Sequence, residues 1–131
     1  IDMDGDTFKC QLHTSTYTPS LSHAVKADID NEVANGSGYT TGGVTISSPT
    51  WVESSGTVTF DSADPAWTAS GGTITARYAI ILDDTPASPA DPLVAYSLLD
   101  NSPADVAVTD GNTLTIQINA SGILTLSGGQ S

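Results

Sequence analysis

The sequence predicts a mainly β protein, a single-domain antiparallel β-sandwich or barrel of about seven or eight strands with one short helix near residues 21–33. Two observations predict this class. Short segments in which β-branched and polar residues alternate recur along the chain, and turn-forming residues separate them. The 131 residues suffice for one ordinary domain, and neither a repeat nor a break in composition divides them. We therefore expect residues 1–131 to form one β-rich domain.

The expected strands follow one another between clusters of Gly, Pro, Asn, Asp and Ser. We place them near residues 6–13, 44–53, 56–61, 73–83, 92–99, 106–109, 113–119 and 123–127. Asp110-Gly111 predicts a tight hairpin between two of them, because this dipeptide tolerates the positive φ of a primed turn. Residues 119–122 predict a second tight connection.

One segment departs from the strand pattern. An apolar residue stands at every fourth position, at Leu21, Val25, Ile29 and Val33. This spacing aligns the four side chains along one stripe of a helix. Ser20 or Ser22 could cap its start, and Asn35-Gly36 could end it. We expect an amphipathic helix that packs its stripe against the sheet.

The candidate core follows from alternation along the strands. Its expected members are Phe8, Cys10, Leu12, Ile74, Tyr78, Ile80, Leu114, Ile116 and Ile118. Cys10 is the only cysteine, so no intrachain disulfide can form. We interpret it as a small buried hydrophobic residue.

The charge balance limits the possible partners. Fifteen Asp and Glu face three Lys and Arg, which gives a net charge of −12. Nucleic-acid binding depends on Lys and Arg to neutralise phosphates, so neither nucleic acid nor an anionic membrane is an expected partner. The sequence contains no apolar run of about 18 residues, the length of a transmembrane helix, and no signal peptide is recognisable at its start.

Asp2, Asp4 and Asp6 resemble the start of a calcium loop. An EF-hand loop requires Gly at its sixth position and Glu at its twelfth, and counting from Asp2 places Thr7 and His13 there. We therefore predict that these aspartates form no calcium site and that the protein uses no other cofactor.

Catalytic motifs are missing from the sequence. It has no Gly-x-Ser-x-Gly elbow, no phosphate-binding loop with its Lys, and no metal-ligand spacing around His13 or His23. Any acid-rich domain offers carboxylate pairs that could serve in glycoside hydrolysis, so such pairs are not specific. We predict that the protein is not an enzyme.

Aromatic residues and a proline-rich loop supply the candidate contact residues. Aromatic side chains anchor cores and interfaces, and they can also form a platform for a sugar. The interface candidates are Tyr17, Tyr39, Trp67, Pro86, Pro89 and Pro92. Arg77, a lone Arg on a β-branched strand of an acidic protein, is expected to pair with a carboxylate or to lie at an interface.

A series of short motifs runs through nearly the whole chain. The most specific are Gly-Tyr-Thr-x-Gly-Gly at residues 38–43 and Ala-Arg-Tyr-Ala at residues 76–79. The others lie at residues 4–15, 17–19, 31–33, 83–86, 92–93 and 122–124. In this order they resemble a family of small structural proteins of tailed-bacteriophage virions. Members of that family carry a short segment before the first strand, which this sequence lacks, and the resemblance transfers no catalytic residue.

The resemblance implies a capsid decoration or cement protein that binds the outer surface of the phage head and stabilises it. Its implied partners are the major capsid protein and other copies of the chain itself. The acidity suits the outer surface of the head better than the inner surface that faces DNA. A tail or neck component is the alternative within the same class, and a carbohydrate-binding adhesion module is the alternative from a different class.

Overall fold

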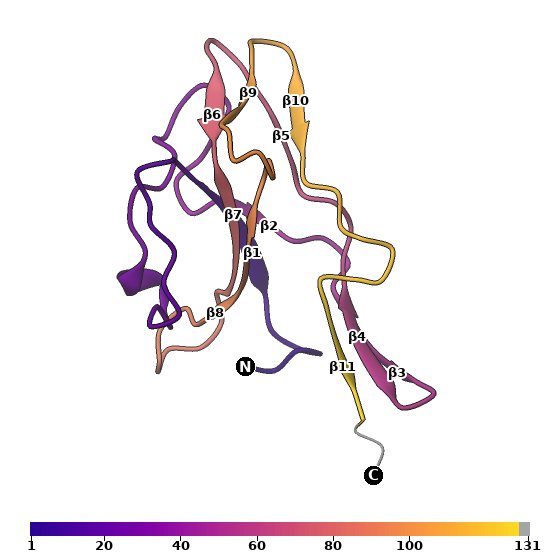
Figure 1. The fold of residues 1–131 in the computed structure, drawn as a ribbon. Helices are drawn as coiled ribbons and strands as arrows, with labels where there is room; N and C mark the ends of the chain where they lie inside the picture. The colour runs from indigo at the N-terminus through magenta and orange to yellow at the C-terminus, as the bar shows by residue number, and fades with distance from the viewer. Residues whose placement is uncertain (129–131) are drawn as a thin grey trace.

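A computed structural model describes residues 1–128 of the chain (Figure 1). Eleven strands account for nearly all of its regular structure. The strands are β1 (Phe8–His13), β2 (Val44–Thr45), β3 (Thr50–Ser54), β4 (Thr57–Asp61), β5 (Ala66–Thr68), β6 (Ile74–Ala76), β7 (Tyr78–Asp83), β8 (Leu93–Leu98), β9 (Val106–Val108), β10 (Thr113–Thr115) and β11 (Leu124–Ser127). The predicted class is confirmed: the protein is mainly β, with antiparallel ladders in a sandwich-like arrangement.

Four antiparallel sheets build the two layers. The four-stranded sheet has the order β2-β1-β7-β8, and the two-stranded ladder of β6 and β9 extends its β7–β8 hairpin. The three-stranded sheet has the order β11-β4-β3, and the ladder of β5 and β10 extends its β4–β11 pair in the same way. All of these pairings are antiparallel. Each layer of the sandwich therefore consists of a larger sheet and a two-stranded sheet, with an irregular stretch between them.

The hydrophobic core lies between these layers. Phe8 from the first layer and Phe60 from the second are both fully buried, and their ring centroids are 4.9 Å apart. Six of the predicted core residues are buried, namely Phe8, Cys10, Leu12, Ile74, Ile80 and Leu114. Tyr78, Ile116 and Ile118 are only half-buried.

The predicted strand at 73–83 is divided at Arg77, and this break changes which side chains face the core. Before it, Ile74 and Ala76 belong to the core cluster, and after it Ala79 and Ile81 do. Because successive residues of a strand point to opposite faces, one irregular residue reverses the pattern. Ile80 is consequently buried outside that cluster, and Tyr78 is not the core residue that simple alternation predicts.

The predicted helix at residues 21–33 is wrong. Only a single 3₁₀ turn, η1 (Lys26–Asp28), forms there, and Leu21 is completely exposed. The Asp28 carboxylate accepts hydrogen bonds from the N–H groups of Ala24 and Val25, which favours a turn over a continuous helix. Within residues 1–128, no helix is long and apolar enough to cross a membrane.

Extended pairing replaces the helix on both sides of this turn. The Leu93 N–H group donates to the Ala24 carbonyl, and the Lys26 N–H group donates to the Asp91 carbonyl, each at 2.9 Å. On the other side of the turn, the Val33 N–H group donates to the Leu12 carbonyl at 2.9 Å. The segment therefore covers the first layer as a strap rather than as a helix.

The predicted turn at Asp110-Gly111 is present, but the hairpin is not. The Asn112 N–H group donates to the Thr109 carbonyl at 2.9 Å, and Gly111 has a φ of +83°. The two strands that leave this turn then separate, because β9 pairs with β6 and β10 pairs with β5. Sequence alternation also missed β5, which lies between the predicted strands at 56–61 and 73–83.

Candidate binding surface along strand β8

Three predicted interface residues lie inside the protein. Tyr17, Tyr39 and Trp67 are 4%, 2% and 3% exposed. Their burial corrects the expectation that these aromatic rings lead contacts with a partner. Tyr39 and Trp67 also cannot serve as a flat platform for a sugar, because both rings are buried and stack on each other at a centroid distance of 6.2 Å.

Hydrogen bonds hold the tyrosine hydroxyls in place. The Tyr39 hydroxyl donates to the Glu32 carboxylate at 2.7 Å and accepts from the Leu12 N–H group at 3.1 Å. Burial raises the pKa of Tyr39, and the hydrogen bond to Glu32 raises it further. The Tyr17 hydroxyl lies 2.8 Å from Nδ1 of His23. The Tyr39 hydroxyl thus joins the strap, residues 14–43, to β1. The bond between Tyr17 and His23 lies within the strap, and the Tyr17 ring packs against His13 of β1 and Tyr78 of β7.

The proline loop is anchored at one end. Pro92 is buried, and its carbonyl accepts from the Asp83 N–H group at 2.9 Å. Pro86 is half-buried and Pro89 is exposed. Only the tip of the loop, residues 87–90, is therefore freely accessible within the described chain.

Arg77 pairs with a carboxylate. Its Nε atom lies 2.9 Å from Oδ1 of Asp105, and both side chains are partly exposed. A pair at such a site contributes little to stability, in the range of about 0–1 kcal/mol. The fold brings the two residues together: Arg77 lies at the break between β6 and β7, Asp105 directly precedes β9, and β9 pairs with β6.

Strand β8 has an open edge that the sequence did not reveal. It ends the four-stranded sheet, and its six residues make it the longest strand at any sheet edge among residues 1–128. The Leu99 N–H group donates to the Arg77 carbonyl, so alternate residues of β8 direct their backbone groups away from β7. Those residues include Tyr96 and Leu98, and their N–H groups have no partner within the described part of the chain.

Three surface hollows lie along β8. The first opens between the two layers, has a volume of about 240 Å³, and is floored by Cys10, Ala79 and Ile81. Ala95 and Ser97 border it on the β8 side, and residues 116–119 with Ile123 border it on the other. The open edge of β8 is therefore also the open side of the sandwich.

The second hollow continues the first along the same side of the molecule. Its volume is about 570 Å³, and it lies between residues 97–99 and residues 113–117. Strand β10 borders it with an open edge of its own. Leu114 is opposite Trp67 of β5, and the Ile116 N–H group donates to the Pro65 carbonyl. Since backbone groups of successive residues point to opposite sides of a strand, Thr115 and Gln117 direct theirs away from β5.

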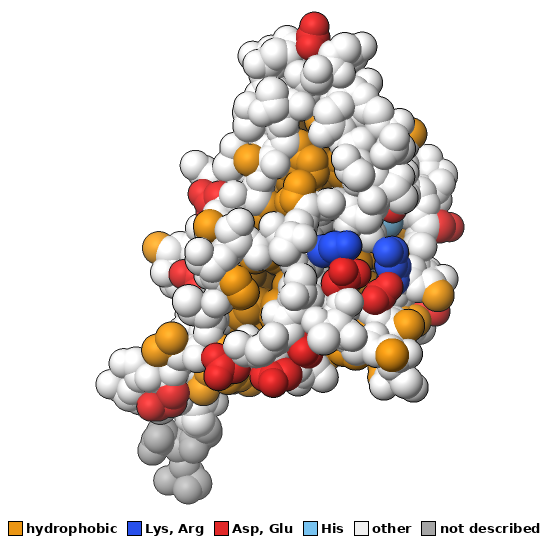
Figure 2. All heavy atoms as spheres, turned by 180° about the vertical axis from the view of Figure 1, so that it is seen from behind, with side chains coloured by type: hydrophobic (Ala, Val, Ile, Leu, Met, Phe, Trp, Pro, Cys, Tyr) orange, Lys and Arg blue, Asp and Glu red, His pale blue; other side chains and the backbone are white. Residues whose placement is uncertain are grey.

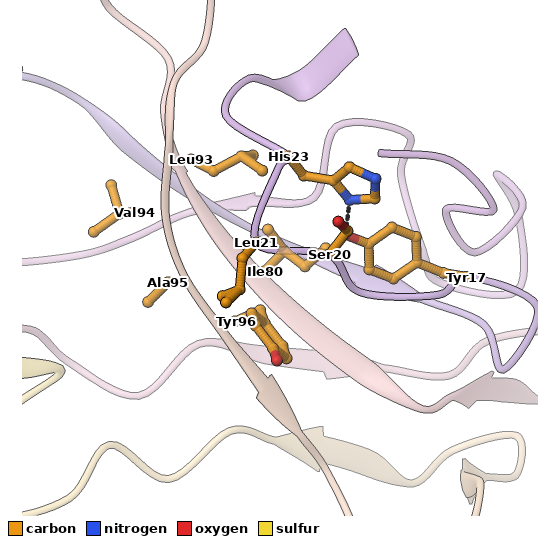
Figure 3. A pocket seen from close by; sticks show the side chains of 9 residues that line it. All are labelled: Tyr17, Ser20, Leu21, His23, Ile80, Leu93, Val94, Ala95 and Tyr96. Carbon is orange, nitrogen blue, oxygen red and sulfur yellow. Dashed lines mark hydrogen bonds between the residues drawn. The ribbon is translucent and has the colours of Figure 1, made fainter. Parts of the chain in front are cut away.

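The third hollow lies on the outer face of β8 (Figure 3). Figure 3 shows the loop that carries Ser20, Leu21 and His23 on one side of it, with Tyr96 and Leu93 of β8 on the other. Its volume is about 170 Å³. Tyr96, which is 54% exposed, contributes to this hollow and to the one between the layers.

Charge is distributed very unevenly around these hollows. All three cations are engaged with carboxylates: Lys9 with Asp84 at 2.9 Å, Lys26 with Asp91 at 3.9 Å, and Arg77 with Asp105. Figure 2 shows blue and red side chains side by side near the centre of one face, next to a band of hydrophobic side chains. The residues that line the three hollows include no Asp, Glu, Lys or Arg.

The N-terminal aspartates fold into a compact turn. The Asp2 carboxylate accepts from the N–H groups of Asp4 and Gly5 at 3.1 Å, and the Asp6 carboxylate accepts from the Asp2 N–H group at 2.6 Å. In the described residues, no group of three or more His, Cys, Asp or Glu side chains is placed to hold a metal ion. Of the three carboxylates in the calcium-like motif, those of Asp2 and Asp6 accept hydrogen bonds from backbone N–H groups of the same turn.

Two buried polar residues of the first layer have shifted pKa values. Burial lowers the pKa of His13, whose Nδ1 atom lies 2.7 Å from the Asp30 carbonyl and whose Nε2 atom lies 3.1 Å from the Gln11 amide. Burial raises the pKa of Asp83, and the neighbouring Asp6 carboxylate raises it further. Oδ1 of Asp83 accepts from the Thr85 N–H group at 3.0 Å, whereas Oδ2 has no partner among residues 1–128.

Comparison with known proteins identifies no relative. No family model, no curated protein and no solved structure matches this chain. The open edge of β8 and its three hollows are therefore the strongest structural indication of where this protein acts.

Proposed function

We propose that this protein is a non-enzymatic structural protein of a tailed-bacteriophage virion, a decoration or cement protein bound to the outer surface of the head. The order of its sequence motifs supports the phage assignment. The structural observation that carries the proposal is the open edge of β8, because uncharged hollows lie on both of its faces in an otherwise acidic domain and Tyr96 borders two of them.

This surface suits binding to a protein shell. Interfaces concentrate contact in regions depleted of charge and leave polar residues at the rim. The β8 region has that character, with aliphatic side chains such as Val94, Ile116 and Ile118 beside hydroxyl and amide groups. In this proposal the major capsid protein is the principal partner, and other copies of the chain are neighbours on the head.

The proposed protein acts by mass action. A protein that binds only the assembled shell stabilises it by RT ln(1 + [L]/Kd) for each site, about 2.7 kcal/mol when its free concentration is a hundred times Kd. Many sites on one head add their contributions. A rigid β-sandwich suits this role because little conformational freedom remains to be lost when it binds.

The test uses expanded heads from which the protein has been removed. Adding the purified protein should restore binding at regular positions over the head and raise the temperature at which heads rupture, with another acidic protein of similar size as the control. Unchanged rupture together with no rebinding would overturn the proposal. Binding of only six or twelve copies at one vertex would instead indicate a tail or neck component.

A further inference from the structure

We propose that the partner docks by adding an extended segment, with basic residues near its ends, to the open edge of β8. The added segment becomes a further antiparallel or parallel strand of the four-stranded sheet. This inference rests on the proposed function for the identity of the partner, the shell protein, whereas the mode of binding follows from β8 itself.

The backbone supplies the first argument. Tyr96 and Leu98 direct their N–H groups to the open edge, and these groups have no partner in the described chain. Strand addition satisfies such groups with main-chain hydrogen bonds and takes its specificity from pockets for alternate side chains. Next to these residues, the strap already pairs with the same edge: the Ala24 carbonyl accepts from the Leu93 N–H group, and the Lys26 N–H group donates to the Asp91 carbonyl.

The hollows supply the second argument. Alternate side chains of an added strand point to opposite faces of the sheet. On one face they meet the opening between the layers, where Ile116, Ile118 and Ile123 are only half-buried. On the other face they meet the outer hollow beside Leu21 and Tyr96. An apolar side chain can therefore be buried on each face of the added strand.

Charge selects the kind of segment. Asp100 follows β8 by two residues, and the Oδ1 atom of Asp64 accepts at 2.8 Å from the N–H group of Ile118, which lines the hollow between the layers. Neither carboxylate belongs to one of the three ion pairs. Basic residues at the ends of the added strand complement both of them. A second copy of this chain would instead bring another net charge of −12 to the edge.

Two variants at one position test strand addition. Tyr96→Pro removes the outward N–H group and places a ring at the edge, where proline is tolerated because no internal ladder bond is lost. Tyr96→Thr removes the same aromatic ring but keeps the N–H group. Binding of each to depleted, expanded heads is measured by co-sedimentation, and thermal unfolding of each free protein checks that both are folded.

We expect Tyr96→Pro to bind the heads about tenfold more weakly than Tyr96→Thr, which corresponds to the loss of one hydrogen bond at the edge together with a steric block. Backbone amide exchange at Tyr96 and Leu98 should also slow when the wild-type protein binds. Equal binding by the two variants, with no protection of these amides, would overturn strand addition while the proposed function stands. Failure of the wild-type protein to bind heads at all would overturn both.

Ionic strength tests the basic segment. Binding should weaken as NaCl is raised, because pairs near the surface are screened over a Debye length of about 10 Å at 0.1 M salt. Asp100→Asn should reduce this dependence, whereas Glu53→Gln, on the distant β3–β4 hairpin, should not. Salt-independent binding would overturn the basic segment. A wild-type dimer that Tyr96→Pro alone dissociates would show that a second copy occupies the edge and would overturn the proposal.

Discussion

Replacing Asp83 by Asn should stabilise the protein at neutral pH. The carboxyl group is completely buried, only one of its oxygens has a hydrogen-bond donor, and a second carboxylate, that of Asp6, is its neighbour. Asn keeps the oxygen that accepts from the Thr85 N–H group. It replaces the oxygen without a partner by an amide group, which can donate to the Asp6 carboxylate.

The magnitude follows from the burial of the group. A buried polar atom without a partner costs about 1–3 kcal/mol, so we expect a gain of about 1–2 kcal/mol in the free energy of unfolding. In a domain of this size that gain raises Tm by about 4–7 °C. The matched control is Asp84→Asn, which removes a half-buried carboxylate paired with Lys9 and should lower stability by about 0–1 kcal/mol.

The dependence on pH provides a second measurement. The pKa of Asp83 is raised in the folded protein above its ordinary value of 3.8, so the unfolded chain releases this proton more readily. The ionised Asp83 carboxylate therefore destabilises the folded protein. This loss of folding free energy is fully present above the folded-state pKa and disappears as the pH falls to about 3.8. Urea unfolding followed by tryptophan fluorescence at pH 7 and pH 4 measures it. A loss of stability at pH 7, or an equal gain at both pH values, would refute the reasoning.

Three further outcomes test the packing around β1. Gly43→Ala should destabilise the fold severely, because Gly43 has a φ of +78° and an added Cβ atom would overlap the Cys10 carbonyl oxygen. The control is Gly56→Ala, where the φ is a similar +81° but the space around the residue is open. Thermal unfolding should show that this control loses only about 1 kcal/mol of stability. The ring of His13 should titrate below pH 6.5 by NMR, and stability should fall as the pH drops below 6.5 because the unfolded state then binds the proton more readily; a midpoint above 6.5 would contradict its burial. Burial raises the pKa of the Cys10 thiol to about 12, so a thiol reagent should modify it at least about a hundredfold more slowly in native protein than in denaturant, and equal rates would be inconsistent with the structure.

Local patterns predicted the strands well, because alternation and turn residues act over a few neighbouring positions. Strand β1 and the β3–β4 hairpin, for example, lie close to their predicted ranges. The spacing of Leu21, Val25, Ile29 and Val33 at every fourth position is also a local pattern, and the helix that it predicted does not form. Val25 forms a bridge with Pro92, and the Val33 N–H group bonds to Leu12, so partners distant in sequence decide the conformation of this segment.

The candidate surface was harder to predict than the fold. The sequence indicates a strand at 92–99, but nothing within those residues says that the strand ends a sheet. That position depends on β7 being its only neighbour in the ladder. Similarly, a tyrosine can anchor a core or an interface equally well. Tyr17 and Tyr39 are buried because the strap that carries them lies against the first layer, and the sequence did not reveal the structure of this segment.

The order of strands in the first sheet also determines when it can form during synthesis. Strand β1 lies between β2 and β7, and its six ladder partners in β7 end at Asp83, about 70 residues later in the chain. At about 5–20 residues per second, a ribosome needs roughly 4–14 s to make that interval. Until then β1 can pair only with the two residues of β2, and the nascent chain exposes the rest of a strand that other chains or a chaperone could bind.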